Sequence, residues 1–290
     1  MTAPRGAHAT IAGKIVGTEI GAVSTSLDAR WLMAYSAALG LDDRRYYDTA
    51  SASGPAAHPL FSVCYEWPAV LALRARTISE RLLKLAVHST HHVVIHRPPS
   101  AHDRLLTRAQ VTEVRSTRTG TLYVARFSTV DRNGRPVTTT EYGSVFRGVE
   151  TDGQTRLVVE PLVRPLPPPS SEARWSKPVP VASWAAHVYS ECARIWNPIH
   201  TDLAVAREAG LSAPILHGSA TLALAVSQVI GRELDGDPAR VREIAARLTG
   251  MVSMPSTITV RGRARAGDLI AFDAVDAGGE PVLSDGVIRT

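Results

Sequence analysis

The sequence predicts an α+β protein built from two units that share one order of elements. In each unit, a long apolar helix comes ahead of several strand-like segments. A proline-rich stretch separates the two units. An apolar helix needs cover on nearly all sides, and a curled antiparallel sheet wrapped around it would provide that cover. We expect the two sheets to join edge to edge, which buries one edge of each.

The first unit is expected over residues 1–150. A helix at 27–40 ends at Gly40, and a longer helix follows at 67–87 with Pro68 near its first turn. The Asn-Gly pair at 133 and 134 predicts a hairpin. The expected strands are 91–98, 104–116, 121–131 and 136–148.

A linker is expected over 151–180, because its closely spaced prolines cannot continue a helix or a central strand. The second unit is expected over 181–290. Its first helix lies at 181–195 and its long apolar helix at 217–234. The expected strands are 242–252, 256–264, 268–277 and 281–289.

The formal charge of +5 comes almost wholly from arginine, since the chain has only three lysines. A positive balance suits an anionic ligand, such as a nucleotide-linked thioester or an acidic carrier protein. The arginines are scattered and no basic run is interleaved with aromatic residues, so nucleic acid is not an expected partner.

No apolar run approaches the roughly 20 residues that a membrane span needs. The N-terminus also lacks the apolar core of a signal peptide, so a cytoplasmic protein without membrane contact is expected. Cys64 and Cys192 stand far apart, outside any disulfide or zinc spacing. His92 and His96 would share one strand face, but no carboxylate or cysteine at ligand spacing supports a metal site there. We therefore expect neither a metal nor a cofactor.

Residues 189–225, "YSECARIWNPIHTDLAVAREAGLSAPILHGSATLALA", contain a dense motif. It resembles the signature of the MaoC-like (R)-specific enoyl-CoA hydratases, the hydratase-2 family. The segments "RRYYDTAS", "FSVCYEW" and "VIHRPPSAHDRLLTRAQV" are similar to the degenerate N-terminal half of two-domain members. The positions that match the motif are Tyr189, Asn197, Pro198, His200, Asp202, Ala206, Gly210, Pro214, Ile215, His217 and Gly218.

This resemblance implies a double hotdog fold, with the active site in the second unit and a substrate tunnel shaped partly by the first. In the family, a His and an Asp hold the water that adds to an enoyl thioester. His200 matches the His, and Gly218 matches the residue whose N–H stabilises the thioester oxyanion at the start of the central helix. Asn197 would hold the catalytic loop in place.

The motif departs from the family at the position of its acid, where this chain has Ile195. Loss of one positioned acid–base group typically costs about 10²–10⁴ in rate. Glu191, one helical turn away, and Asp202 are the two candidate surrogates, and the alternative role of Asp202 is to cap the next helix. A second departure places Arg194 where the family has glycine.

Two further residues of the motif have alternative roles. Arg194 is expected either to face solvent at a helix end or to contact a ligand phosphate or carboxylate. His217 is expected to pack or cap at the start of the long helix, with contact to substrate as the alternative. Ile195 would line the substrate site with them.

Three functions compete. The leading one is a hydro-lyase-type enzyme acting on an enoyl or 3-hydroxyacyl thioester, carried by coenzyme A or a carrier protein and possibly polyketide-derived. Ile195 leaves room for a non-standard addition, isomerisation or cyclisation. The alternative is a non-catalytic acyl-binding scaffold or partner subunit, and a hotdog thioesterase is third. A double hotdog contains its own pseudo-dimer, so a monomer or a homodimer is expected.

Overall fold

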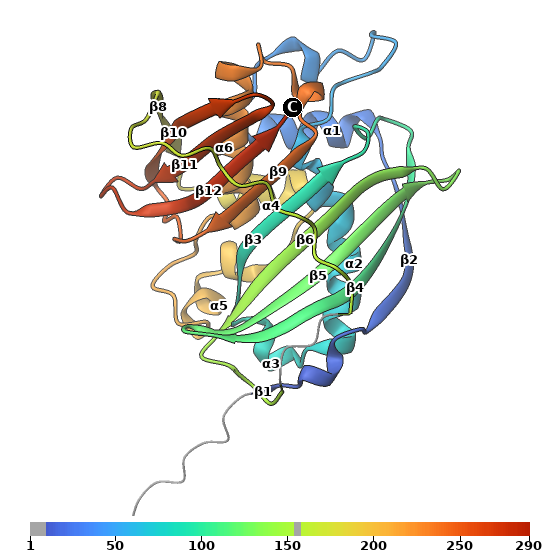
Figure 1. Cartoon of the computed structure of the whole chain (residues 1–290), viewed down its shortest axis with the longest axis vertical. Helices are drawn as coiled ribbons and strands as arrows, with labels where there is room; N and C mark the ends of the chain where they lie inside the picture. Colours follow the sequence, from blue (N-terminus) through green and yellow to red (C-terminus); the bar gives the residue numbers. More distant parts are fainter. Residues whose placement is uncertain (1–9, 154–157) are drawn as a thin grey trace, which may run out of the picture.

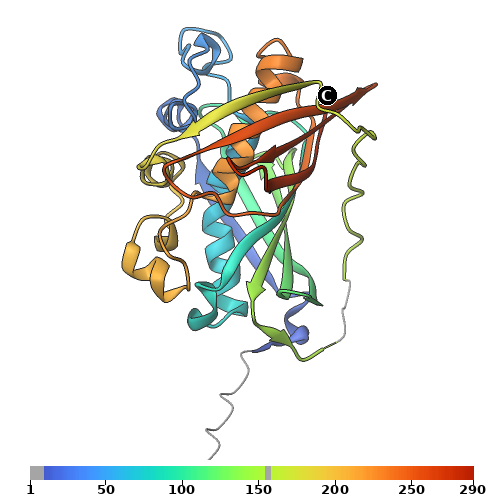
Figure 2. The same ribbon diagram turned by 90° about the vertical axis from the view of Figure 1, so that its left-hand side faces the viewer.

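One ten-stranded sheet organises the computed structural model, which describes residues 10–153 and 158–290 (Figure 1). The strand order is β2-β4-β5-β6-β3-β9-β12-β11-β10-β8. Strands β2 to β6 belong to the first unit and β8 to β12 to the second. The long helices α2 and α6 lie on the same face of this sheet (Figures 1 and 2). The fold is a double hotdog, as the family resemblance implies.

The elements of the first unit begin with a short strand that pairs in parallel with β7, apart from the main sheet. Its helices and 3₁₀ turns are η1 (Gly13–Ile15), α1 (Ala29–Ala38), η2 (Arg44–Tyr46), η3 (Pro59–Phe61), α2 (Ser62–Thr77) and α3 (Glu80–Leu83). Its strands are β1 (Thr10–Ile11), β2 (Glu19–Ser26), β3 (Ala86–Ile95), β4 (Arg104–Thr117), β5 (Gly120–Asp131), β6 (Pro136–Arg147) and β7 (Glu150–Thr151).

The second unit repeats the helix-then-strands order. Its helices and 3₁₀ turns are α4 (Ala185–Ala193), η4 (Pro198–His200), α5 (Leu203–Glu208), α6 (Gly218–Glu233) and η5 (Pro238–Arg240). Its strands are β8 (Trp175–Val181), β9 (Glu243–Leu248), β10 (Ser256–Ala266), β11 (Leu269–Val275) and β12 (Pro281–Arg289). Among the described residues, no helix combines the length and the apolar character that crossing a membrane requires.

The two half-sheets join through β3 and β9, which pair antiparallel with His92 opposite Ala245. The His92 Nε2 atom lies 2.6 Å from Glu243 Oε1, and Arg289 donates to the other oxygen of Glu243 at 2.8 Å. The prediction of one continuous sheet is confirmed. This joint brings α2 and the first turn of α6 to one cavity, which therefore draws side chains from both units.

The long helix of the first unit is shifted from its predicted position. Helix α2 begins at Ser62 rather than at residue 67, and Pro68 lies inside it rather than in its first turn. The earlier start buries Cys64 and Tyr65 in the core. Pro68 is exposed, so its ring meets solvent rather than the core. The helix ends at Thr77, and Ala86 already belongs to β3, because the apolar residues at 86–95 complete the sheet instead of extending the helix.

The predicted linker includes an edge strand. Residues Trp175–Val181 form β8, which pairs with β10 at the end of the sheet. Pro178 and Pro180 lie within it, and an edge strand tolerates residues that lack a backbone N–H. The Trp175 indole donates to Glu233 Oε1 of α6 at 2.7 Å, which anchors the strand to the central helix. Residues 154–157 of the linker lie outside the described residues.

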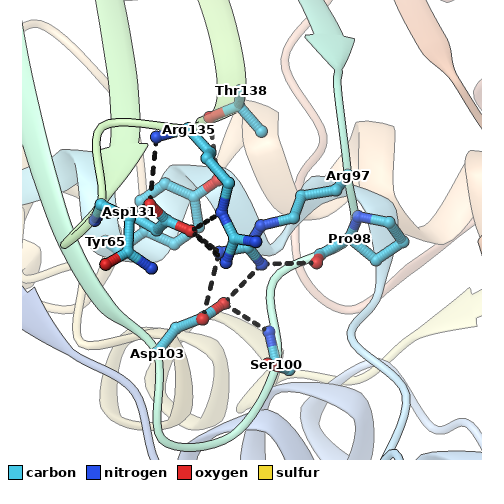
Figure 3. Close-up of polar contacts among 9 residues, drawn as sticks. Tyr65, Arg97, Pro98, Ser100, Asp103, Asp131, Arg135 and Thr138 are labelled. Atoms are coloured by element: carbon cyan, nitrogen blue, oxygen red, sulfur yellow. Dashed lines mark hydrogen bonds and ion pairs between the residues drawn. The ribbon is translucent and has the colours of Figure 1, made fainter.

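An ion-pair cluster fixes the loops at one end of the first unit (Figure 3). Arg97, just after β3, donates to both carboxylate oxygens of Asp103 at 2.8 and 3.1 Å. It also reaches Asp131, to which Arg135 donates at 2.8 Å across the predicted hairpin. Gly134 has φ +77°, as expected for the Asn-Gly turn. The cluster is structural and ties the β3–β4 loop to the β5–β6 hairpin.

Candidate active site

A cavity lies between the two units, and both contribute to its wall. Its volume is about 80 Å³, and one enclosed water needs about 10–15 Å³ of such space. It therefore has room for several waters or a short acyl segment. The first unit contributes Val63, Glu66, Trp67, Val70, Arg74, Ala86, Val87, His88 and Tyr142. The second unit contributes Ile195, Asn197, Ile199, His200, Ile215 to Ser219, Thr221, Leu248 and Gly250 to Val252.

Helix α4 sets the position of Ile195. It ends at Arg194, whose φ of +57° is left-handed, and the Ile195 N–H donates to the Ser190 carbonyl at 3.0 Å. This conformation suits the glycine found in the family and costs another residue about 1–2 kcal/mol. The turn directs Ile195 into the cavity wall, where its side chain is 5% exposed.

The Arg194 side chain points toward the first unit rather than into the cavity. Its guanidinium lies 4.1 Å from the centroid of the Trp31 ring and 4.0 Å from Asp28. The stacking on Trp31 offsets the backbone strain. Arg194 is not among the described residues that line the cavity. The structure thus places this predicted substrate-binding residue against α1.

His200 ends the 3₁₀ turn η4 and lines the cavity. Its Nδ1 atom lies 2.8 Å from the Ile215 carbonyl oxygen, which can only accept a hydrogen bond. Nδ1 must therefore carry the proton, and Nε2 keeps the lone pair. Burial lowers the pKa of His200 to about 4, against the opposing effect of the Ile215 carbonyl. At neutral pH the ring is an unprotonated base with a fixed tautomer.

His217 lies directly against His200, with ring centroids 3.8 Å apart. Its Nε2 atom is 3.2 Å from the Ser190 hydroxyl oxygen of α4. Burial, and then the neighbouring His200, hold the pKa of His217 well below its ordinary value. A neutral stacked ring fixes the plane of His200 and adds no charge to the cavity.

Gly218 begins α6, and its N–H is one of those that the helix leaves without an intrahelical acceptor. His217, at the N-cap, makes no side-chain capping bond. A Cβ built on Gly218 would collide with a Leu248 methyl and lie 3.2 Å from His88 Cβ. Glycine is thus required by close packing from both units, and the helix N-terminus faces the cavity that His200 lines.

The remaining predicted residues take different positions. Asn197 lines the cavity and its carbonyl accepts from the His200 N–H at 3.1 Å, so its backbone helps to hold η4. Asp202 caps α5 by accepting from Ala204 at 2.8 Å. Glu191 is exposed and accepts from the Trp196 indole at 3.2 Å. Among the described residues, neither of these two carboxylates lines the cavity.

The histidines in and just after β3 have separate partners. His92 pairs with Glu243 and His96 lies 3.0 Å from the Thr139 hydroxyl oxygen. His88 instead stacks on Tyr142, with ring centroids 4.0 Å apart. Within residues 10–153 and 158–290, no three His, Cys, Asp or Glu side chains come together as a metal site would need.

Two polar residues of α2 lie in the cavity wall and were not predicted from the sequence. Glu66 is 2% exposed, and its Oε1 atom accepts from the hydroxyls of Thr140 at 2.7 Å and Thr138 at 3.3 Å. Burial raises the pKa of Glu66 to about 8, although these hydroxyls lower it. Arg74 is 9% exposed and lies two turns further along the same helix. One helical face carries Val63, Glu66, Val70 and Arg74. This spacing is the feature of the sequence that could have identified Glu66 and Arg74 as residues of the site.

Comparison with known proteins agrees with this architecture. A family model described as a MaoC like domain matches residues 167–271. A second model, described as a FAS1-like dehydratase domain region, matches residues 14–140. The chain contains a MaoC-like domain. The first match covers α4, η4 and α6, so His200 and Gly218 lie within the MaoC-like domain.

Several relatives of this MaoC-like protein have been described. It is 26% identical over 54% of its length to the peroxisomal multifunctional enzyme type 2 of Drosophila melanogaster, and 26% identical over 63% to a probable enoyl-CoA hydratase 2 of Dictyostelium discoideum. The matched segments span only 26% and 62% of those two proteins. A MaoC-like dehydratase from Phytophthora capsici superimposes with a TM-score of 0.79 at 21% identity, over 95% of both chains. That likeness shows the shared fold.

Proposed function

We propose that this MaoC-like protein catalyses addition and elimination of an oxygen nucleophile on an enoyl or 3-hydroxyacyl thioester. The observation that supports this most is the His200 ring, whose lone pair on Nε2 is available in the same cavity as the N-terminus of α6. A base and an oxyanion donor are the two groups that such a reaction needs at its reacting atoms. The carrier is coenzyme A or a carrier protein.

In the proposed reaction, His200 is the only proton carrier. Its Nε2 atom takes the proton from the attacking hydroxyl while the oxygen bonds to the β-carbon. The thioester carbonyl becomes an enolate, and the Gly218 N–H and the positive end of α6 stabilise its oxygen. His200 then returns the proton to the α-carbon, so that H and O–R have added across the double bond.

Ile195 decides which nucleophiles suit the site. A free water would be anchored by His200 alone, since the side chain in place of the family's acid cannot accept a hydrogen bond. A hydroxyl carried by the acyl chain needs no such anchor, because its tether supplies the proximity. We therefore infer that a tethered hydroxyl reacts faster than water, which gives cyclisation in preference to hydration.

A second candidate is a non-catalytic acyl-binding scaffold or partner subunit, and Ile195 favours it. The same cavity would hold an acyl chain without reaction. A fixed His200 tautomer beside a helix N-terminus has no purpose in such a scaffold. We therefore place the enzyme first.

Incubation with crotonyl-CoA, longer enoyl-CoAs and a 2-enoyl-CoA bearing a 7-hydroxyl, whose attack on the β-carbon closes a six-membered ring, tests the proposal. We expect the hydroxylated substrate to react fastest, and His200→Ala to lose at least 100-fold in kcat/KM. No turnover of any member of the panel by the folded protein would favour the scaffold. Equal turnover by the wild type and His200→Ala would remove His200 from the mechanism.

A further inference from the structure

Arg74 is a buried cation in the wall of the cavity. It projects from α2 of the first unit and is 9% exposed. Among the described residues, no carboxylate lies within 4.0 Å of it, whereas other buried or half-buried arginines such as Arg126 and Arg97 have carboxylate partners. Buried charges in proteins are normally paired. The missing counter-charge is the anomaly that needs an explanation.

The surroundings of Arg74 hold its side chain in place and leave donors free. Its Nη2 atom donates to the Ser144 hydroxyl at 2.8 Å. The guanidinium carbon lies 5.9 Å from the Trp67 ring centroid and 5.7 Å from that of Tyr142, whose hydroxyl it also approaches. A guanidinium has five N–H groups, and Ser144 and Tyr142 occupy at most two. The others have no acceptor among the described residues.

The charge balance of the cavity is positive. Burial, together with His91 and Arg74, holds the pKa of His88 low, so this ring is neutral. His200 is neutral for the reason given above, and Glu66, with a pKa of about 8, is mainly protonated at neutral pH. Arg74 is therefore the one permanent charge among the described residues of the cavity wall.

Arg74 is linked to the start of α6 through two packed side chains of the cavity wall. Tyr142, which it contacts, stacks on His88 at 4.0 Å, and His88 Cβ lies 3.2 Å from the Cβ position of Gly218. An anion bound at Arg74 would thus belong to the part of the substrate near the thioester carbonyl. The phosphates of coenzyme A are separated from that carbonyl by the whole pantetheine arm, so they fit this position poorly.

We propose that Arg74 binds a carboxylate carried by the acyl chain, so that the substrate class is a dicarboxylic acyl thioester. The identity of the thioester rests on the proposed function. Arginine suits this role, because its planar fork can bind both carboxylate oxygens. Ser144 and the two aromatic rings position the fork, and the carboxylate supplies the counter-charge that the cavity lacks.

Equilibrium binding of succinyl-CoA and butyryl-CoA by calorimetry tests this inference. Both are saturated and cannot undergo addition, so the result does not depend on whether the proposed reaction occurs. We expect succinyl-CoA to bind the wild type about 10–100-fold more tightly, the range for a charged hydrogen bond. Arg74→Met should remove this preference and leave butyryl-CoA binding within about threefold, whereas Arg74→Lys should keep part of it.

Arg76→Met is the matched control, because Arg76 is an exposed cation on the same helix that donates to the Glu19 carbonyl at 2.9 Å. It should leave both affinities unchanged. Equal binding of the two thioesters by the wild type would overturn the proposal, even if Arg74→Met does not fold. Equal weakening of both thioesters by Arg74→Met would also overturn it, and would assign the cation to a phosphate of the carrier.

Discussion

Replacement of Ile195 by Asp should convert the site toward water addition. The side chain at this position is 5% exposed and lines the cavity with His200. A carboxylate there could accept a hydrogen bond from a water in the cavity that His200 also lines, and share the proton transfer. The expected gain in kcat for hydration of crotonyl-CoA is about 10²–10⁴, the usual contribution of one positioned acid–base group.

The same substitution should destabilise the fold. It removes a buried Ile side chain, which contributes about 1.5–3 kcal/mol, and it places a carboxyl group in a largely apolar wall. Ile195→Asn has a similar shape and polarity but cannot transfer a proton, so it should lower the free energy of unfolding comparably without the gain in rate. The assay follows the loss of enoyl absorbance, with urea unfolding of each variant. A folded Ile195→Asp protein no faster than Ile195→Asn would refute the reasoning.

Three other predictions follow from the same site. Gly218→Ala should destabilise the protein by about 1–3 kcal/mol through overpacking and reduce kcat/KM. The control Gly231→Ala lies in open space on the same helix and should stabilise the protein by about 0.5–1 kcal/mol. Thermal unfolding of the two variants measures both changes. Since the pKa of His200 is lowered to about 4, kcat/KM should change little between pH 7.5 and 5.5, and a loss of about tenfold would indicate an ordinary histidine with a pKa near 6.5. The pKa of Glu66 is raised from 4.5 to about 8 in the folded state, so its contribution to stability is present below pH 4.5 and is lost as pH rises to 8. Urea unfolding should therefore show the wild type losing a few kcal/mol of stability relative to Glu66→Gln between these two pH values. Parallel pH curves for the two proteins would contradict this.

Much of the second unit could be predicted from the sequence, because its information is local. The motif from Tyr189 to Gly218 fixes a helix, a 3₁₀ turn and the start of the next helix. The role of Asp202 could be predicted for the same reason. An Asp directly before a helical segment indicates an N-cap, and Asp202 accepts from the Ala204 N–H. The alternation of apolar residues in the strands likewise predicted the sheet.

The first unit's share of the site could not be predicted, because it depends on contacts between residues distant in sequence. Glu66 and Arg74 look like ordinary polar positions on an amphipathic helix until β3 and β9 join the sheets and bring α2 beside α6. The position of the Arg194 side chain could not be predicted for the same reason. Its stacking on Trp31 pairs residues from different units, so the sequence left open whether it faced solvent or a ligand.

The central claim is that the unprotonated Nε2 of His200 carries the proton. Its most direct test is the kcat/KM of His200→Gln relative to the wild type on the best substrate of the panel, because Gln can still donate to the Ile215 carbonyl. A loss of about 10²–10⁴ with an unchanged midpoint of unfolding is expected. A folded His200→Gln protein with the kcat/KM of the wild type would contradict the claim that Nε2 of His200 carries the proton.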